Sequence, residues 1–185
     1  ERYVREGKLV PDLVVLMSEH RTFKYFKEET LERYARQYGW TLIDDSNRKE
    51  LFLEMVRQMD MSYSYKPVLI KAILRHADEK GRIQLTDIVT YFRAYYEGRR
   101  AAGLVVEKPN SLFARGGYTD KEAERNILAN PFKRFEDMQM LRHTRTLGIV
   151  QVDESVWKKL TAGEKAEMEK ICEEKLEQYF SRLAQ

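Results

Sequence analysis

The sequence predicts a mainly α protein with a small β-hairpin, arranged as a winged-helix-like domain with extra helices and preceded by a small helical module. Two observations support this prediction. Apolar residues recur at helical spacing along most of the 185 residues, and these runs are bounded by capping residues, Gly or Pro. Residues 141–152 instead have β-branched residues around Gly148, which is typical of a two-stranded hairpin.

The composition indicates a folded protein in a reducing compartment. Hydrophobic residues make up 43% of the chain and charged residues 34%, which provides a core and a highly charged surface. The single cysteine, Cys172, excludes an internal disulfide and favours a cytoplasmic location. No apolar run approaches the roughly 20 residues that cross a bilayer, so we expect no membrane partner. Because the sequence starts with Glu1 rather than Met, we expect a piece of a longer protein.

Residues 1–45 are expected to form a small helical module or linker region. Pro11 and Asp12 can open a helix, since Pro is tolerated in a first turn and Asp suits the positive end of the helix dipole. Apolar residues follow these two at helical spacing. A second helix is predicted over residues 28–38, with Gly39 as its terminating residue.

Residues 46–185 are expected to form the winged-helix-like accessory domain. Its boundary follows from four consecutive turn-favouring residues at positions 44–47. The predicted order beyond them is helix, helix, helix, loop, helix, short helix, hairpin and helix. Capping boxes at Thr119 and Thr161 mark two of the helix starts. In a winged helix-turn-helix protein, one helix enters a DNA groove and the hairpin wing rests on the backbone.

Motifs for catalysis are incomplete in this chain. Gly116-Gly117 is the one glycine pair, and no Gly-Lys-Ser or Gly-Lys-Thr follows it, which argues against a phosphate-binding loop. The three histidines are far apart in sequence, and His76 is interpreted as a buried histidine on the inner face of its helix. We therefore expect no catalytic residue, no metal ligand and no cofactor in this chain. A divergent metal-dependent nuclease remains an alternative, which would require Asp12 to converge with other carboxylates.

Basic residues are concentrated in the middle of the chain. The net charge is −1 over residues 1–60, +6 over residues 61–160 and −2 over residues 161–185. This distribution favours a polyanionic partner. The candidate nucleic-acid-binding residues are Arg115, Lys121, Arg125, Lys133, Arg134, Arg142, His143 and Arg145.

Strand alternation predicts which hairpin residues share a face. If Arg142 points to one side of the hairpin, His143 and Arg145 point to the other. A wing of this kind could straddle a phosphate backbone. Two alternatives stay open: these residues are solvent-facing charges paired with nearby carboxylates, or the chain is a protein-docking module. The carboxylates in question are Glu122, Glu124, Glu136 and Asp137.

Three strings carry a resemblance to a known family. Residues 59–69 (MDMSYSYKPVL), residues 116–122 (GGYTDKE) and residues 130–138 (NPFKRFEDM) resemble the C-terminal accessory region of bacterial superfamily II DEAD/DEAH-box helicases. The resemblance covers roughly residues 47–183. It implies an accessory domain that positions DNA or RNA for a helicase core on the same polypeptide, with DNA favoured over RNA.

The same resemblance limits which activities transfer to this chain. The implied parent protein uses ATP and Mg²⁺ and works in DNA restriction, defence or repair. The Walker-type loop and the Asp-Glu-Ala-Asp/His box are both missing from this sequence, so ATPase activity does not transfer. The family supplies no catalytic residue that can be placed on these positions.

Overall fold

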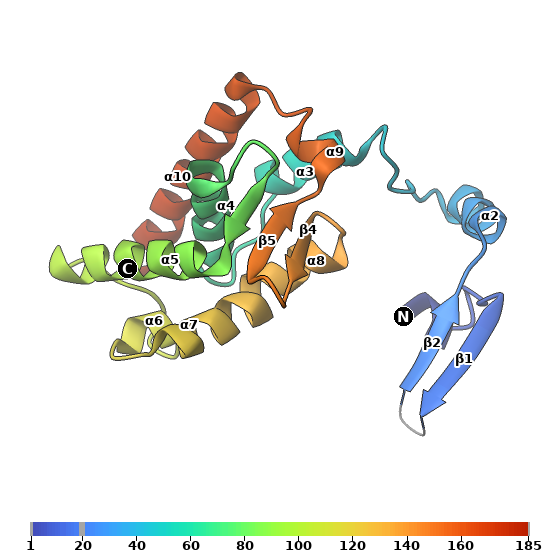
Figure 1. Ribbon diagram of the computed structural model, residues 1–185, viewed down its shortest axis with the longest axis horizontal. Helices are drawn as coiled ribbons and strands as arrows, with labels where there is room; N and C mark the ends of the chain where they lie inside the picture. Colours follow the sequence, from blue (N-terminus) through green and yellow to red (C-terminus); the bar gives the residue numbers. More distant parts are fainter. Residues whose placement is uncertain (1, 19–20, 185) are drawn as a thin grey trace. The chain divides into compact units, whose positions relative to one another are not determined.

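A computed structural model of the protein describes residues 2–18 and 21–184. The fold is mainly helical with two small antiparallel sheets, which confirms the predicted fold class (Figure 1). The chain divides into two compact units, Glu1–Asp44 (unit 1) and Asp45–Gln185 (unit 2). The division falls one residue before the expected boundary.

Unit 1 contains a β-hairpin where a helix was predicted. Its four elements are α1 (Arg2–Arg5), β1 (Leu13–Ser18), β2 (Arg21–Tyr25) and α2 (Glu28–Tyr38). The prediction of a helix that starts at Pro11 is therefore wrong, whereas the helix over residues 28–38 and its left-handed Gly39 are confirmed.

The error at Pro11 has two physical causes. Residues 13–17 are apolar at every position, so the spacing of their apolar residues cannot distinguish a helix from a strand. Asp12 was predicted to lie at the start of a helix that follows it, but its carboxylate instead bonds to residues at the start of α2. It accepts hydrogen bonds from the Lys27 N–H (2.7 Å) and the Thr30 hydroxyl (2.9 Å). These bonds hold the pKa of Asp12 below its usual value.

Unit 1 has almost no core. Among its described residues only Thr30 and Ala35 are buried. Large apolar side chains are instead exposed along the hairpin and next to it, and Leu16 is 71% exposed. The exposed set comprises Tyr3, Val10, Leu13, Val14, Leu16, Met17, Phe23, Tyr25 and Ile43.

Unit 2 contains the remaining elements. Its longer helices are α3 (Arg48–Arg57), α4 (Tyr65–His76), α5 (Leu85–Ala101), α7 (Asp120–Ile127) and α10 (Ala162–Leu183). Its short helical pieces are α6 (Leu112–Arg115), the kinked segment Leu128–Phe132, α8 (Lys133–Asp137) and α9 (Glu154–Trp157). Its strands are β3 (Arg82–Gln84), β4 (Leu141–Thr144) and β5 (Ile149–Val152).

The sheet of unit 2 has the strand order β3-β5-β4, and both pairings are antiparallel. The main elements follow in the order α4, β3, α5, α7, β4 and β5, with short helical pieces between α5 and β4, and the last strand lies in the middle of the sheet. This is the topology of a winged helix domain, in which the β4–β5 hairpin is the wing. The hairpin was predicted from the sequence, but β3 was not, because only Ile83 of its three residues is apolar and buried.

The core of unit 2 surrounds α4. Val68, Leu69 and Ala72 on this helix are fully buried, and α4 packs against α5 on one side and α10 on another (Figure 1). Cys172 lies on the buried apolar face of α10 and is itself fully buried. The stripe of α4 ends before His76, which is exposed and meets Tyr91 edge-on, so the buried assignment of His76 is wrong.

A buried carboxylate fixes the long loop that follows α5. Glu107 accepts hydrogen bonds from the N–H (2.8 Å) and hydroxyl (2.5 Å) of Ser64, from the Lys108 N–H (2.9 Å) and from the Tyr179 hydroxyl. The Tyr96 hydroxyl donates to Ser64 in turn (2.7 Å). Ser64 directly precedes α4 but makes no side-chain cap bond to it, because its hydroxyl bonds within this cluster.

Candidate nucleic-acid interface

Helix α7 presents two cations on its outer face. Its start is fixed by the predicted capping box, in which Thr119 and Glu122 bond each other's backbone N–H groups. Ala123 and Ile127 are buried on the inner side. Lys121 and Arg125 are four residues apart, so they share a face, and both are exposed.

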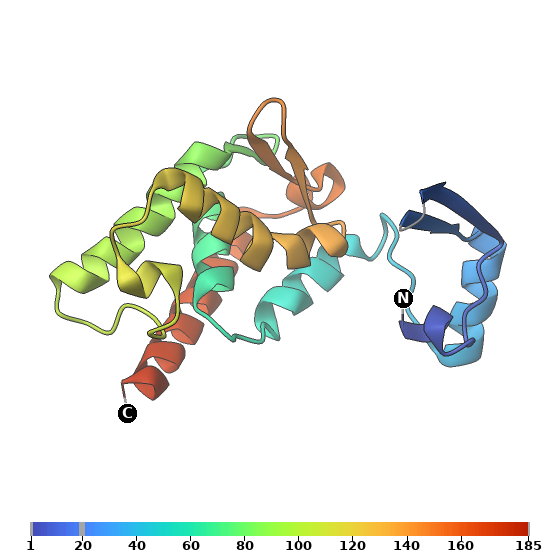
Figure 2. The same cartoon turned by 90° about the horizontal axis from the view of Figure 1, so that it is seen from below.

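The wing is a short hairpin with a fixed turn. In the turn, the Leu147 N–H donates to the Thr144 carbonyl (3.1 Å) and the Gly148 N–H donates to the Arg145 carbonyl (3.3 Å). Gly148 adopts a left-handed conformation with φ 62°. Its carbonyl accepts from the Leu85 N–H at the start of α5 (2.7 Å), so the turn is tied to the body of the unit. Figure 2 shows the hairpin (orange) projecting beyond the helices of unit 2.

A concave surface, here called the wing cleft, lies between the wing, the start of α5 and the α7–α8 segment. Its volume is about 660 Å³. Apolar side chains and cations both line it, and the carboxylates of Glu124 and Glu136 also face it. The lining residues are Gln84, Leu85, Thr86, Glu124, Leu128, Phe132, Lys133, Glu136, His143, Arg145, Leu147 and Gly148.

The alternation predicted for the wing holds in the structure. His143 and Arg145 line the wing cleft, whereas Arg142 lines a different pocket. The His143 ring meets Phe132 edge-on with ring centres 6.0 Å apart. Its Nε2 atom is buried and has no hydrogen-bond partner. Arg145 is exposed and reaches the cleft from the turn.

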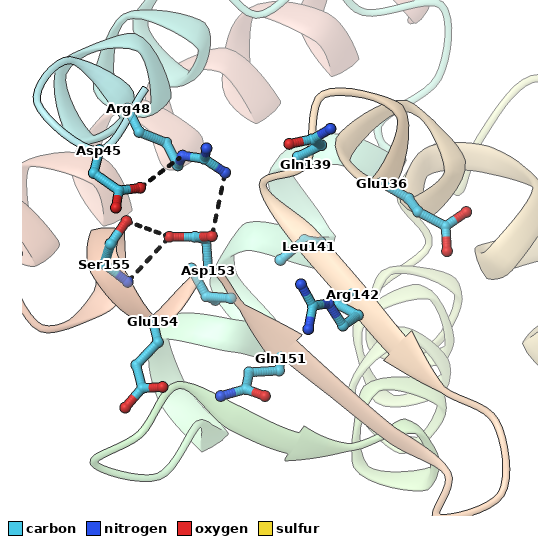
Figure 3. Close-up of a pocket in the computed structure, with 11 residues that line it drawn as sticks. Asp45, Arg48, Glu136, Gln139, Leu141, Arg142, Gln151, Asp153, Glu154 and Ser155 are labelled. Atoms are coloured by element: carbon cyan, nitrogen blue, oxygen red, sulfur yellow. Dashed lines mark hydrogen bonds and ion pairs between the residues drawn. The ribbon is translucent and has the colours of Figure 1, made fainter. Parts of the chain in front are cut away.

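Arg142 lies in surroundings unsuited to phosphate. Its pocket has a volume of about 470 Å³ and is lined by four carboxylates, those of Asp45, Glu136, Asp153 and Glu154. The other guanidinium there, Arg48, is already paired with Asp153 at 3.3 Å, and Asp153 also caps α9 (Figure 3). The structure therefore separates Arg142 from Arg145, although both were expected to contact nucleic acid from the wing.

The remaining candidates lie in three different settings. Lys133 lines the wing cleft but is paired with Asp137 (2.7 Å) and Glu136 (3.1 Å). Arg134 lines a separate groove between α3 and α8 that contains three methionines. Arg115 is exposed at the end of α6.

Ion pairing separates these candidates into two groups. Within the described part of the chain, Lys133 is the one member of the eight that forms an ion pair. The expected pairing with nearby carboxylates is therefore confirmed for Lys133 alone. Among the described residues, four cations without an ion pair lie on α7 and the wing: Lys121, Arg125, Arg142 and Arg145. Of these four, Arg145 alone lines the wing cleft. Glu124 lines the cleft one helical turn after Lys121, and Leu128, just beyond α7, lines it one turn after Arg125.

None of the four large apolar residues that line the cleft was among the candidates from the sequence: Leu85, Leu128, Phe132 and Leu147. Leu128 lies at the end of α7 and Leu147 in the turn of the wing. A detectable signal existed at Leu147, because a large apolar residue between Thr146 and Gly148 is unusual in a hairpin turn.

Comparisons of the chain with protein-family models, with curated proteins and with solved structures find no match. In the described residues, no group of three or more His, Cys, Asp or Glu side chains is arranged to hold a metal ion. The helices of the described residues also include none that is both long and apolar enough to cross a membrane.

Proposed function

We propose that unit 2 is a non-catalytic accessory domain that binds duplex nucleic acid through α7 and the wing. The observation that carries the proposal is that Arg145 lines the wing cleft, that Lys121 and Arg125 are exposed on α7, which contributes Glu124 to the same cleft, and that none of the three forms an ion pair in the described part of the chain. Unpaired Lys and Arg side chains neutralise phosphates and release condensed counterions, which supplies most of the affinity of non-specific binding. In the proposed complex, α7 faces a groove and the wing rests on the adjacent backbone.

The proposal names DNA rather than RNA as the partner. The major groove of B-form DNA admits an α-helix, whereas that of A-form RNA is too narrow for side chains to read. Following the resemblance of residues 47–183, the domain would hold DNA for a motor on the same polypeptide, and that motor would use ATP and Mg²⁺. The domain itself contributes no chemical step.

A salt series tests this proposal. Fluorescence anisotropy of a labelled DNA duplex gives the binding constant at each salt concentration, for the natural chain and for a variant with Lys121, Arg125 and Arg145 changed to Ala. Each lost phosphate contact reduces the slope of log K against log salt by about 0.9, so the triple variant should lose roughly 2 to 3.

A charge-matched control separates local contact from overall charge. Lys158, Lys170 and Arg182 are exposed and lie on α10 or just beyond α9. Changing these three to Ala removes the same charge and should leave the slope nearly unchanged. Equal losses from both triple variants would contradict the proposed interface, and a lack of binding even at low salt would contradict nucleic-acid binding by this chain.

A second candidate function, docking of a protein partner, is favoured by unit 1. Apolar residues occupy consecutive positions of β1, so exposed apolar side chains lie on both faces of the hairpin. On β2, Thr22 and Lys24 are exposed. Continuous apolar strands are typical of sheets covered on both faces, and a charged strand is typical of a sheet edge. The partner that fits is the open edge of a β-sheet in another protein or domain, which would pair with the free side of β1.

This candidate makes a prediction for the chain alone. The exposed hairpin should bind a hydrophobic dye such as ANS. Changing Leu16 and Met17 to Ser should reduce dye binding without shifting the thermal unfolding of unit 2. Unchanged dye binding in that variant would show that the hairpin is covered in solution.

A further inference from the structure

The tip of the wing carries an exposed apolar side chain. Leu147 is 64% exposed, and in the described part of unit 2 its only exposed apolar counterparts of similar size are Leu104 and Val105, in the loop after α5. The turn around Leu147 is fixed by its own hydrogen bonds and by the bond from the Leu85 N–H. Leu147 is therefore held at the tip of a firm hairpin, next to the unpaired Arg145.

The outer face of α7 exposes two cations, Lys121 and Arg125. Its exposed cations suit phosphates, and the amide side chain on this helix, Asn126, has its Oδ1 buried. Amide side chains are the usual partners of adenine edges in the major groove.

The backbone of an unbroken duplex offers Leu147 no apolar surface. The backbone presents phosphates and water to a side chain that lies over it, whereas the end of a duplex presents the flat apolar face of its last base pair. Proteins that distort DNA use apolar side chains of this type against base steps. Burial of Leu147 against a base pair removes its apolar surface from water, which favours the complex.

The wing cleft beside Leu147 can hold the nucleotide that follows the last pair. Leu128 and Phe132 provide apolar walls, and Arg145 provides a cation for the phosphate. A volume of about 660 Å³ falls within the range of small-ligand sites. His143 also lines this cleft.

We propose that the wing recognises the junction between duplex and single-stranded DNA. Leu147 packs against the last base pair, Arg145 contacts the backbone at the junction, and the wing cleft takes the first unpaired nucleotide. This inference rests on the proposed function, because it specifies which form of DNA the same interface prefers.

Competition binding tests the inference. A labelled forked duplex is bound by the chain and displaced either by the unlabelled fork or by a covalently closed circular duplex, which has no ends. We expect the fork to compete about tenfold better per nucleotide, a preference that corresponds to about 1.4 kcal/mol. Leu147→Ala should abolish the preference and leave the salt dependence of binding unchanged. Leu104→Ala, which truncates an exposed leucine outside the wing, should keep the preference.

The outcomes separate the two proposals. Equal competition by fork and circle, or an unchanged preference in Leu147→Ala, would overturn junction recognition while leaving duplex binding intact. A lack of binding to either DNA at low salt would overturn the proposed function, and the inference with it. Loss of the preference for the fork in both leucine variants would contradict the assignment of that preference to Leu147.

Discussion

Glu107→Ala is expected to lower the free energy of unfolding of unit 2 by about 3–5 kcal/mol. The carboxylate accepts four hydrogen bonds and is 4% exposed. Its removal leaves donors on Ser64 and Tyr179, both buried, without an acceptor. A buried donor left unsatisfied costs about 1–3 kcal/mol, and the losses within one cluster are not additive.

The structure also predicts a graded series. Glu107→Gln keeps one acceptor oxygen but places an NH₂ group against the groups that donate to the carboxylate. Its decrease in the free energy of unfolding should therefore lie between zero and that of Glu107→Ala. Glu177→Ala, on the exposed side of α10, should change the unfolding free energy by less than about 0.5 kcal/mol. Urea denaturation followed by circular dichroism measures all three. A loss below about 1 kcal/mol in Glu107→Ala would refute the assignment of this cluster as the anchor of the loop.

Three further predictions concern pH, thiol chemistry and a tight turn. Hydrogen bonds from Lys49 and from the backbone of Thr161 hold the pKa of Glu164 at about 2, against an ordinary value of 4.5. Because the folded-state pKa is depressed, this stabilisation is present above pH 4.5 and is lost as the pH falls toward 2. Glu164→Gln should therefore flatten the acid branch of the stability profile, and an unchanged branch would contradict the pairing. Burial raises the pKa of Cys172 to about 12, so a thiol reagent should modify it only on unfolding, and rapid modification of the native chain would contradict its burial. Gly81 has φ 74°, and a Cβ there would lie 2.7 Å from Trp157 Cγ, so Gly81→Ala should cost about 1–3 kcal/mol in a thermal unfolding experiment. A variant as stable as the natural chain would show that this turn can relax.

Features set by neighbouring residues could be predicted from the sequence. The capping boxes at Thr119 and Thr161 and the last helix all depend on residues within a few positions of each other, and all are present. The wing was predicted correctly for the same reason, since its strands and turn are contiguous.

Features set by distant residues could not be predicted. The Ser64 hydroxyl makes no cap bond to α4 because it donates to the carboxylate of Glu107, which lies 43 residues further along the chain. β3 forms only because β5, far along the chain, pairs with it. Alternation placed Arg142 on the face opposite Arg145, but the carboxylates that surround Arg142 come together only in the folded chain.

Site-specific photocrosslinking tests the central claim most directly. Because Cys172 is fully buried, a cysteine introduced at the exposed wing residue Thr146 can be labelled selectively with a photoactivatable group. A matched variant carries the label at Gln178, which is exposed on α10. Our account predicts that the Thr146→Cys chain crosslinks to duplex DNA in a salt-sensitive manner and that the Gln178→Cys chain does not. Crosslinking from Gln178 alone, or equally from both positions, would contradict DNA binding by the wing.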